Sequence, residues 1–258
     1  MVIRRIREHA AHADWFTVGL DLLIVIIGVF LGMQANNWNE TRVERQQAES
    51  YRTRLVEDLR ANESDLKQRR EYYRQVRHHA LAALEVLDHP SASAGEQFLI
   101  DSFQATQIVP RTLSRFTYDE MIAAGGLDRL GNAALRTRVK NYYSAMETAE
   151  TTFRSTPPYR EHLRRVMPYQ VQQRARIRCR EKLGTAQSGE QTNVLPTSCA
   201  LELDYEIVAK AVTRIRSSPE IADDLTRHLI DLDLKLDLFD LFEGRARNLR
   251  QNMEVKTS

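Results

Sequence analysis

Asp21 is the one acidic residue inside the longest apolar run of the chain, and an ionisable group there has chemical meaning. In a bilayer such a carboxylate is costly unless it is protonated, paired or close to the interface. Gly28 and Gly32 follow as a G-x-x-x-G pair, whose missing side chains allow two helices to approach closely. At about 100° per residue, Asp21, Gly28, Gly32 and Ala35 share one face of a helix. We expect this face to be a helix–helix contact; the alternative is that Asp21 reaches the headgroups and the glycines are incidental.

Cys179 and Cys199 are the only two cysteines, and they bracket a segment that contains Gly184, Gly189 and Pro196. A lone pair around a turn-rich segment is typical of a disulfide that closes a loop. Because disulfides persist outside the cytoplasm, this pair favours a periplasmic or extracellular location for the large domain. The alternative is two unrelated buried thiols.

The sequence contains no recognisable catalytic constellation and implies no cofactor. Phosphate-loop, nucleophile-elbow, zinc-protease and paired C-x-x-C motifs are absent. Glu85 and His89 are one helical turn apart, with His78 and His79 upstream, but sparse histidines on a polar helix are usually solvated and we expect no metal site. The basic segment 174–182 is balanced by nearby acids and the net charge is +2, so we expect no nucleic-acid partner.

The proposed contact face around Asp21 exists only if the segment is a membrane-spanning helix, which we predict at residues 15–38. From Phe16 to Ala35, about twenty nearly uninterrupted apolar residues are long enough to cross a hydrocarbon core of roughly 30 Å. Trp15 and Trp38 lie at its ends, where the indole prefers the lipid–water boundary. A cleaved signal peptide fits poorly, because a cut after Ala35 lacks the small residue required two positions earlier. A buried core helix would rarely lack a polar face over this length.

A polar collar follows the predicted span and marks its exit from the membrane. Its amides suit headgroups and backbone and its indole fixes the depth, so an anchoring collar is favoured over a ligand-binding site. Arginines on both sides leave the positive-inside rule undecided. The cysteine pair therefore decides the orientation, with a cytoplasmic lead-in at residues 1–14. The collar residues are Asn36, Asn37, Trp38, Asn39 and Glu40.

Beyond the collar the sequence predicts one long amphipathic helix at residues 39–90, and no proline separates it from the predicted span, so the two can be continuous. Apolar residues recur at alternating spacings of four and three from Leu55 to Leu87, interrupted by Asn62 and Arg69. These polar interruptions favour a packed bundle helix over a parallel coiled coil that would serve as a dimerising stalk.

The remaining residues, 91–250, are predicted to form an all-helical bundle domain, with a tail at 251–258, so the fold class is mainly α. Prolines and glycines divide the domain into shorter helices, including one at 159–183 that Pro168 kinks. Alternating residues within 174–207 make a disulfide-stapled hairpin conceivable, but helical spacing beyond Leu203 favours helices there. The last helix is expected to start at the Ser-Ser-Pro-Glu sequence at 217–220.

Two sets of residues carry a resemblance to known proteins. The first is Asp21 followed by Gln34, Asn36, Asn37, Trp38, Asn39 and Glu40; the second is Thr117-Tyr118-Asp119-Glu120, Ala124-Gly125, Asn132, Leu135 and Tyr142-Tyr143. Over about its first 145 residues, the chain resembles a family of uncharacterised bacterial single-pass inner-membrane proteins, whose members have Glu in place of Asp21. The resemblance implies an inner-membrane protein with a mostly helical domain, and it implies no known activity.

Two functions of different classes follow. The favoured one is a membrane-anchored interaction or scaffold protein that contacts lipid and forms a homo-oligomer through the Asp21–Gly28–Gly32 face. The alternative is a proton-coupled subunit, because Leu20–Val25 resembles the single span of energy-transducing proteins that pair with a multi-pass membrane partner. In that case Asp21 would carry the proton. An enzyme would need a pocket that the sequence does not show.

Overall fold

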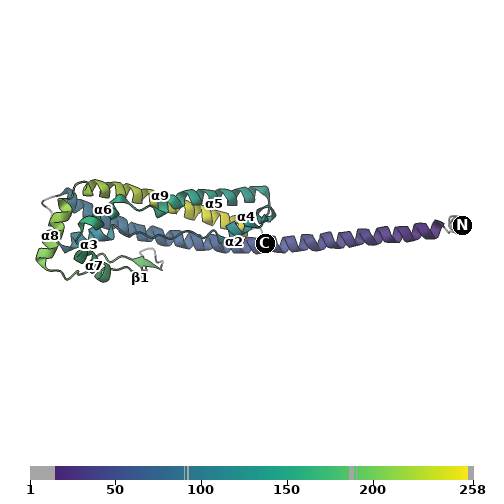
Figure 1. Ribbon diagram of the computed structural model, residues 1–258, viewed down its shortest axis with the longest axis horizontal. Helices are drawn as coiled ribbons and strands as arrows, with labels where there is room; N and C mark the ends of the chain where they lie inside the picture. The colour runs from purple at the N-terminus through teal and green to yellow at the C-terminus, as the bar shows by residue number, and fades with distance from the viewer. Residues whose placement is uncertain (1–14, 90, 92, 186–188, 190, 255–258) are drawn as a thin grey trace, which may run out of the picture.

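The computed structural model describes residues 15–89, 91, 93–185, 189 and 191–254 and has the predicted mainly helical fold. The predicted lead-in and residues 255–258 of the predicted tail lie outside the described residues. Helix α2, Trp15–Asp88, is a single helix of 74 residues that joins the predicted span to the long amphipathic helix without a break. Figure 1 shows its first half projecting alone from the bundle and its second half lying inside it.

Helix α9, Ile221–Glu254, packs antiparallel against the bundled half of α2 and forms the centre of the core. On both helices the buried residues recur at alternating spacings of four and three, which keeps one seam facing the partner helix. The predicted seam of α2 is confirmed from Leu55 to Ala83. Its two polar interruptions, Asn62 and Arg69, are buried in the seam and are each 1 % exposed.

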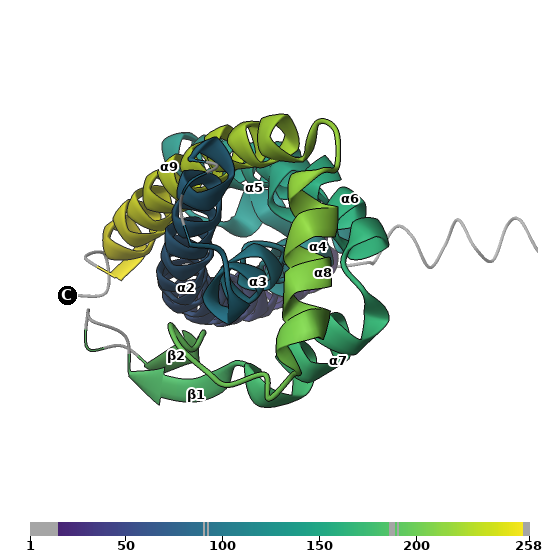
Figure 2. The same ribbon diagram turned by 90° about the vertical axis from the view of Figure 1, so that its left-hand side faces the viewer.

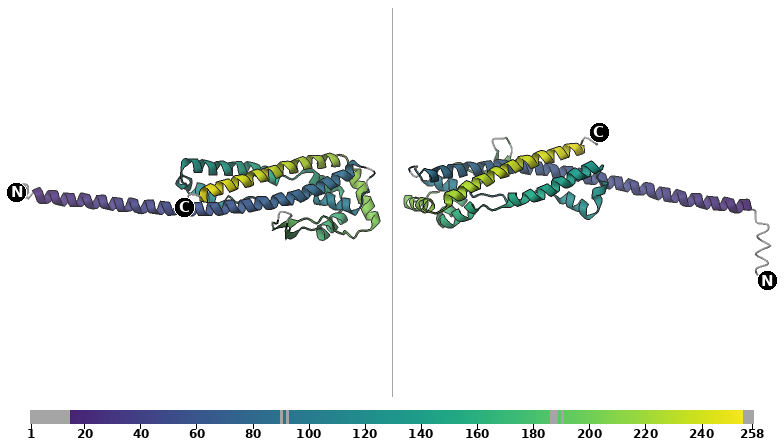
Figure 3. Two further views of the ribbon diagram at one scale, coloured as in Figure 1. Left: turned by 180° about the vertical axis from the view of Figure 1, so that it is seen from behind. Right: turned by 90° about the horizontal axis from the view of Figure 1, so that it is seen from above.

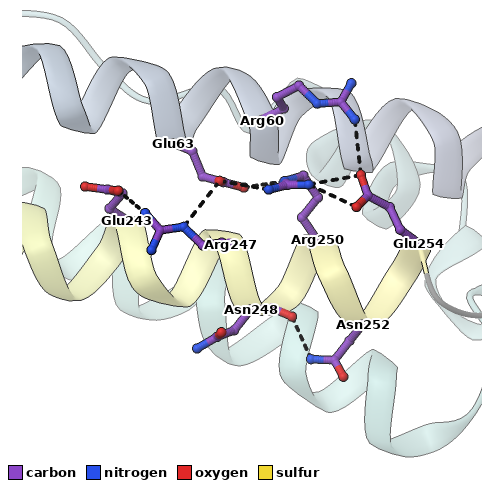
Figure 4. Close-up of polar contacts among 8 residues, drawn as sticks. All are labelled: Arg60, Glu63, Glu243, Arg247, Asn248, Arg250, Asn252 and Glu254. Carbon is purple, nitrogen blue, oxygen red and sulfur yellow. Dashed lines mark hydrogen bonds and ion pairs between the residues drawn. The ribbon is translucent and has the colours of Figure 1, made fainter. Parts of the chain in front are cut away.

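Ion pairs flank this seam and fix its register (Figure 4). Arg60 Nη2 lies 3.1 Å from Glu254 Oε1, and Arg250 Nε lies 2.5 Å from Glu63 Oε1. Further along, Arg70 pairs with Asp240 and Glu243, and Arg77 pairs with Asp233. The more exposed of these pairs, such as Arg60 with Glu254 and Arg77 with Asp233, contribute about 1 kcal/mol or less each, so we attribute most of the packing energy to the apolar seam and the alignment of the helices to the charges.

Shorter helices complete the bundle in two groups (Figures 1 and 2). Near the point where α2 leaves the bundle lie α4, the 3₁₀ helix η1 and the first turns of α5, and the other helices gather toward the far end. Their bounds are α3 Glu96–Gln104, α4 Phe116–Ala123, η1 Gly126–Arg129, α5 Ala133–Arg154, α6 Pro158–Val166, α7 Tyr169–Arg178 and α8 Tyr205–Arg216.

Several predicted boundaries shift for identifiable reasons. The helix expected at 159–183 is broken rather than kinked, because the residue before Pro168 adopts an extended conformation and α6 ends at Val166. Helix α9 begins at Ile221, after a left-handed Glu220. At its other end α9 continues to Glu254, beyond the predicted end of the bundle at residue 250.

A short antiparallel hairpin corrects the prediction of helices alone within 174–207. Strands β1, Lys182–Thr185, and β2, Gln191–Val194, pair Lys182 with Val194 and Thr185 with Gln191. The segments whose alternation made a hairpin conceivable are not its strands, because α7 continues through Arg178 and α8 begins at Tyr205. In Figure 2 the hairpin and α9 lie on different sides of α2.

Candidate functional site

The exposed part of α2 carries the residues that the sequence singled out for helix contact. Every residue from 19 to 47 is exposed, and both views in Figure 3 show this segment standing clear of the bundle. The helix is long and apolar enough near its N-terminal end to cross a membrane. A Cβ atom added at Gly28 or Gly32 would meet nothing within 4 Å. Asp21, Gly28, Gly32 and Ala35 are all helical, so their spacing places them along one open side of α2.

The predicted collar is a helical continuation of the same segment. Asn36, Asn37, Trp38, Asn39 and Glu40 are exposed, and Trp38 has 69 % of its surface accessible. Thr41 Oγ1 donates to Asn37 O at 2.8 Å, within one turn of the helix. Because the backbone is in the helix, the collar offers its side-chain amides, indole and carboxylate to the surroundings.

The second set of residues that carries the family resemblance contacts α2 where the bundle begins. We call this contact the junction, and it comprises Arg54, Asp58 and Asn62 of α2 together with residues 114–120. Asp58 Oδ2 accepts from Thr117 N at 3.0 Å, which satisfies a free amide in the first turn of α4. Asn62 holds Ser114 by two hydrogen bonds of 2.8 and 2.7 Å. Glu120 forms a bidentate pair with Arg54 at 2.5 and 3.1 Å, and this hydrogen bonding raises the pKa of Arg54.

Tyrosines extend the junction into the core. The ring of Tyr118 stacks on Tyr143 with 4.3 Å between centroids, and Tyr142 meets Tyr143 edge to face at 5.0 Å. Burial raises the pKa of both Tyr142 and Tyr143, so their hydroxyls stay protonated. Asn132 caps α5 by accepting from Leu135 N at 2.9 Å.

A close backbone approach completes the junction. Gly125 has a left-handed φ of 62° after the end of α4, a conformation that glycine adopts without strain and that stops the helix. A Cβ added at Gly126 would lie 3.1 Å from the ring of Tyr51, so η1 can approach α2 because this residue has no side chain. Arg129 Nη1 then donates to Gln47 Oε1 at 2.6 Å, on the exposed part of α2.

Sequence reasoning missed the α2 half of the junction. In the sequence Asn62 interrupts the predicted apolar seam, and Arg54 and Asp58 belong to no recognised motif. The available signal was the spacing of four between these polar residues, which places them in one row along the helix. The junction contacts bring the residues of the second resemblance set, from Thr117 to Tyr143, together at one end of the bundle.

Cys179 and Cys199 form a disulfide across a sequence separation of 20 residues, and the loop that it closes contains the hairpin. The carbonyl of Cys179 accepts from Gln104 Nε2 at 2.6 Å. The hairpin docks on α2, where Leu195 N donates to Gln75 Oε1 at 2.7 Å. The disulfide therefore ties a surface hairpin to the helical core.

Within the residues that the structure describes, no group of three or more His, Cys, Asp or Glu side chains is arranged to hold a metal ion. Glu85 and His89 form an exposed pair at 3.3 Å, whereas His79 is buried and lies 2.7 Å from Asp101. An open groove of about 470 Å³ runs between α5 and α9 and is lined by Arg138, Arg245 and Asn248 among others. These side chains are suited to polar contact rather than to nucleophilic catalysis.

Comparison of the chain with protein-family models, with curated proteins and with solved structures finds no match. The resemblance to bacterial single-pass inner-membrane proteins therefore stays a prediction.

Proposed function

We propose that this chain is a membrane-anchored scaffold that presents a helical bundle at a fixed distance from the bilayer. The observation that carries the proposal is the continuity of α2, whose exposed first half is apolar and whose second half supplies the core seam. An apolar helix with no protein neighbour over this length suits a lipid environment. From Ala35 to Tyr51 the helix rises about 24 Å, so the bundle stands clear of the lipid surface.

The orientation that we propose has a cytoplasmic N-terminus and a periplasmic bundle, in the inner membrane of a bacterium. The disulfide between Cys179 and Cys199 supports the periplasmic placement of the bundle, because such bonds persist in oxidising compartments. The family resemblance supports the bacterial inner membrane.

Self-association through the Asp21–Gly28–Gly32–Ala35 face is the second element of the proposal. Both glycines leave the backbone open to close approach by another helix, and small residues at this spacing are typical of transmembrane dimers. In a parallel pair the second copy would bring its own Asp21 to the same level, and two carboxyl groups that share a proton can hydrogen-bond to each other, which lowers the cost of holding them in lipid.

Membrane fractionation tests the anchor, because an integral protein remains in the membrane pellet after carbonate extraction and a peripheral one is released. Release of the intact chain by carbonate would overturn the anchor.

A membrane dimerisation reporter tests the contact face. Gly28→Leu with Gly32→Leu is expected to remove most of the association signal. Gly19→Leu is the matched control, because Gly19 is half a helical turn out of phase with Gly28 and is equally open. Equal signals from the double variant and the control would refute this face as the contact.

A further inference from the structure

Two arginines of α6 meet the buried C-terminal end of α3. Arg160 Nη1 donates to the carbonyl of Thr106, and Arg164 Nη2 donates to Thr106 Oγ1 at 2.8 Å. Thr106 is fully buried, and its hydroxyl in turn donates to Phe103 O at 2.7 Å. Cations at a helix C-terminus complement the partial negative charge of its carbonyls. Each capping contact uses one of the five N–H donors of a guanidinium and leaves the others available.

The positive charges of Arg160 and Arg164 have no carboxylate partner within the described part of the chain. The Nε atom of Arg164 is buried and lacks a hydrogen-bond partner. Burial lowers the pKa of Arg160, and burial together with the charge of Arg160 lowers the pKa of Arg164 to about 10. The pair is therefore a concentration of positive charge that the fold does not neutralise.

Helix α2, which packs against α3, adds a buried arginine and a buried tyrosine. Arg69 is 1 % exposed, and its one acidic neighbour is Asp65, at 2.5 Å from Nη2. Its Nε and Nη1 atoms are buried without hydrogen-bond partners. Tyr73 OH accepts from Val109 N at 3.1 Å, which leaves the hydroxyl proton to donate. Tyr73 lies one helical turn beyond Arg69 in α2, and Val109, which it binds, follows by three residues the Thr106 that both α6 arginines bind. Burial raises the pKa of Tyr73, and the Val109 amide and the charges of Arg69 and Arg160 oppose that rise.

We propose that Arg69, Tyr73, Arg160 and Arg164 form a binding site for a small soluble oxyanion, such as a sulfate, a phosphate or the carboxylate of a metabolite. Planar guanidinium groups match the oxygen geometry of such anions and bind them through paired N–H donors. Lys235 adds a further cation above the Tyr73 ring, with Nζ 5.4 Å from the ring centroid. Capping of α3 uses one N–H donor of each α6 arginine. A bound anion would in addition give hydrogen-bond partners to the unpaired N–H donors of Arg69 and Arg164.

The position of the site favours a soluble anion over a lipid headgroup. Tyr73 follows the end of the apolar run by 38 residues of continuous helix, which is a rise of about 57 Å. A headgroup beside the span would not reach this distance.

Thermal unfolding of the full-length chain in a nonionic detergent tests the site. Sodium sulfate and sodium phosphate are titrated against sodium chloride at equal ionic strength, and circular dichroism at 222 nm follows the midpoint. We expect a saturable rise in midpoint with sulfate or phosphate. Arg160→Gln with Arg164→Gln should weaken half-saturation at least about tenfold. The control Arg165→Gln with Arg176→Gln removes the same charge from exposed positions and should behave as the wild type.

Three results would overturn the proposal. One is a rise that does not saturate or that chloride reproduces, since sulfate also stabilises proteins by exclusion from their surface. Another is an equal response in the two double variants. A third is a shift that phosphatidylglycerol in the micelles produces and soluble anions do not. If Arg160→Gln with Arg164→Gln does not fold, Tyr73→Phe decides, because it keeps every charge; it should weaken half-saturation about fivefold, and no change contradicts the site.

Discussion

Acidification is predicted to destabilise the bundle through His228, which is 2 % exposed in the α9 seam. Its Nε2 atom donates to Ala105 O at 2.9 Å, and its ring stacks on Tyr159 at 5.9 Å between centroids. Its other nitrogen, Nδ1, is buried without a hydrogen-bond partner. A proton added there would place a charge in an apolar site close to the cationic Lys235. Burial, partly opposed by the Ala105 hydrogen bond and by Asp231, lowers the pKa of His228 from 6.5 to about 4.

The direction and size of the effect follow from this lowered pKa. The folded state favours neutral His228. The contribution of His228 to the free energy of unfolding is therefore complete above pH 6.5 and is lost as the pH falls from 6.5 toward 4. At pH 5 His228 is almost fully protonated in the unfolded chain and almost fully neutral in the folded chain. The resulting loss is about 2 kcal/mol between pH 7.5 and pH 5.

Urea unfolding of the wild type and of His228→Gln, measured at pH 7.5 and at pH 5, isolates this contribution. Glutamine keeps a donor for Ala105 O and does not titrate. Both tryptophans, Trp15 and Trp38, lie outside the bundle, so circular dichroism is the suitable signal. We expect the wild type to lose about 2 kcal/mol more than the variant on acidification. Equal losses in both proteins would show that the His228 environment does not disfavour its charged form.

Two further predictions concern the attachments of the core. Replacing Cys179 and Cys199 by serine is expected to lower the free energy of unfolding by about 3 kcal/mol, from the loop entropy released over 20 residues; reduction of the wild type should produce the same loss, and an unchanged urea midpoint would contradict the estimate. Asn62→Leu is expected to cost about 1–3 kcal/mol because it removes the hydrogen-bond partner of both Ser114 backbone groups at the half-buried junction; an unfolding midpoint equal to that of the wild type would contradict this reasoning.

The helical architecture was predictable because it depends on periodicities that the sequence displays. The alternating spacing from Leu55 to Ala83 predicts the seam that the structure buries. The Asn132 cap and the Gly125 stop act locally, and their residue types are visible. The hairpin was not predictable in its observed position, because its strands have four residues each and weak alternation. The disulfide and the contacts with α2 hold it in place.

The junction and the anion site were harder to recognise for a related reason. Asp58 and Asn62 bind main-chain atoms of Ser114 and Thr117, and a sequence does not mark a backbone group as a binding partner. Arg160 and Arg164 resemble the other arginines of an arginine-rich chain until tertiary packing partly buries them against Thr106. Their chemistry arises from where α3 ends, which depends on the Thr106 side chain bonding Phe103 O.

The unbroken course of α2 makes it a lever. In the membrane-anchored arrangement that we propose, α2 would tilt as transmembrane helices do, by about 20° on average, and its far end lies about 90 Å from the middle of its apolar segment. Such a tilt displaces the far end sideways by about 30 Å. A change in bilayer thickness that alters the tilt by a few degrees would thus move the outer surface of the bundle by several ångströms, with no hinge in between to absorb the motion.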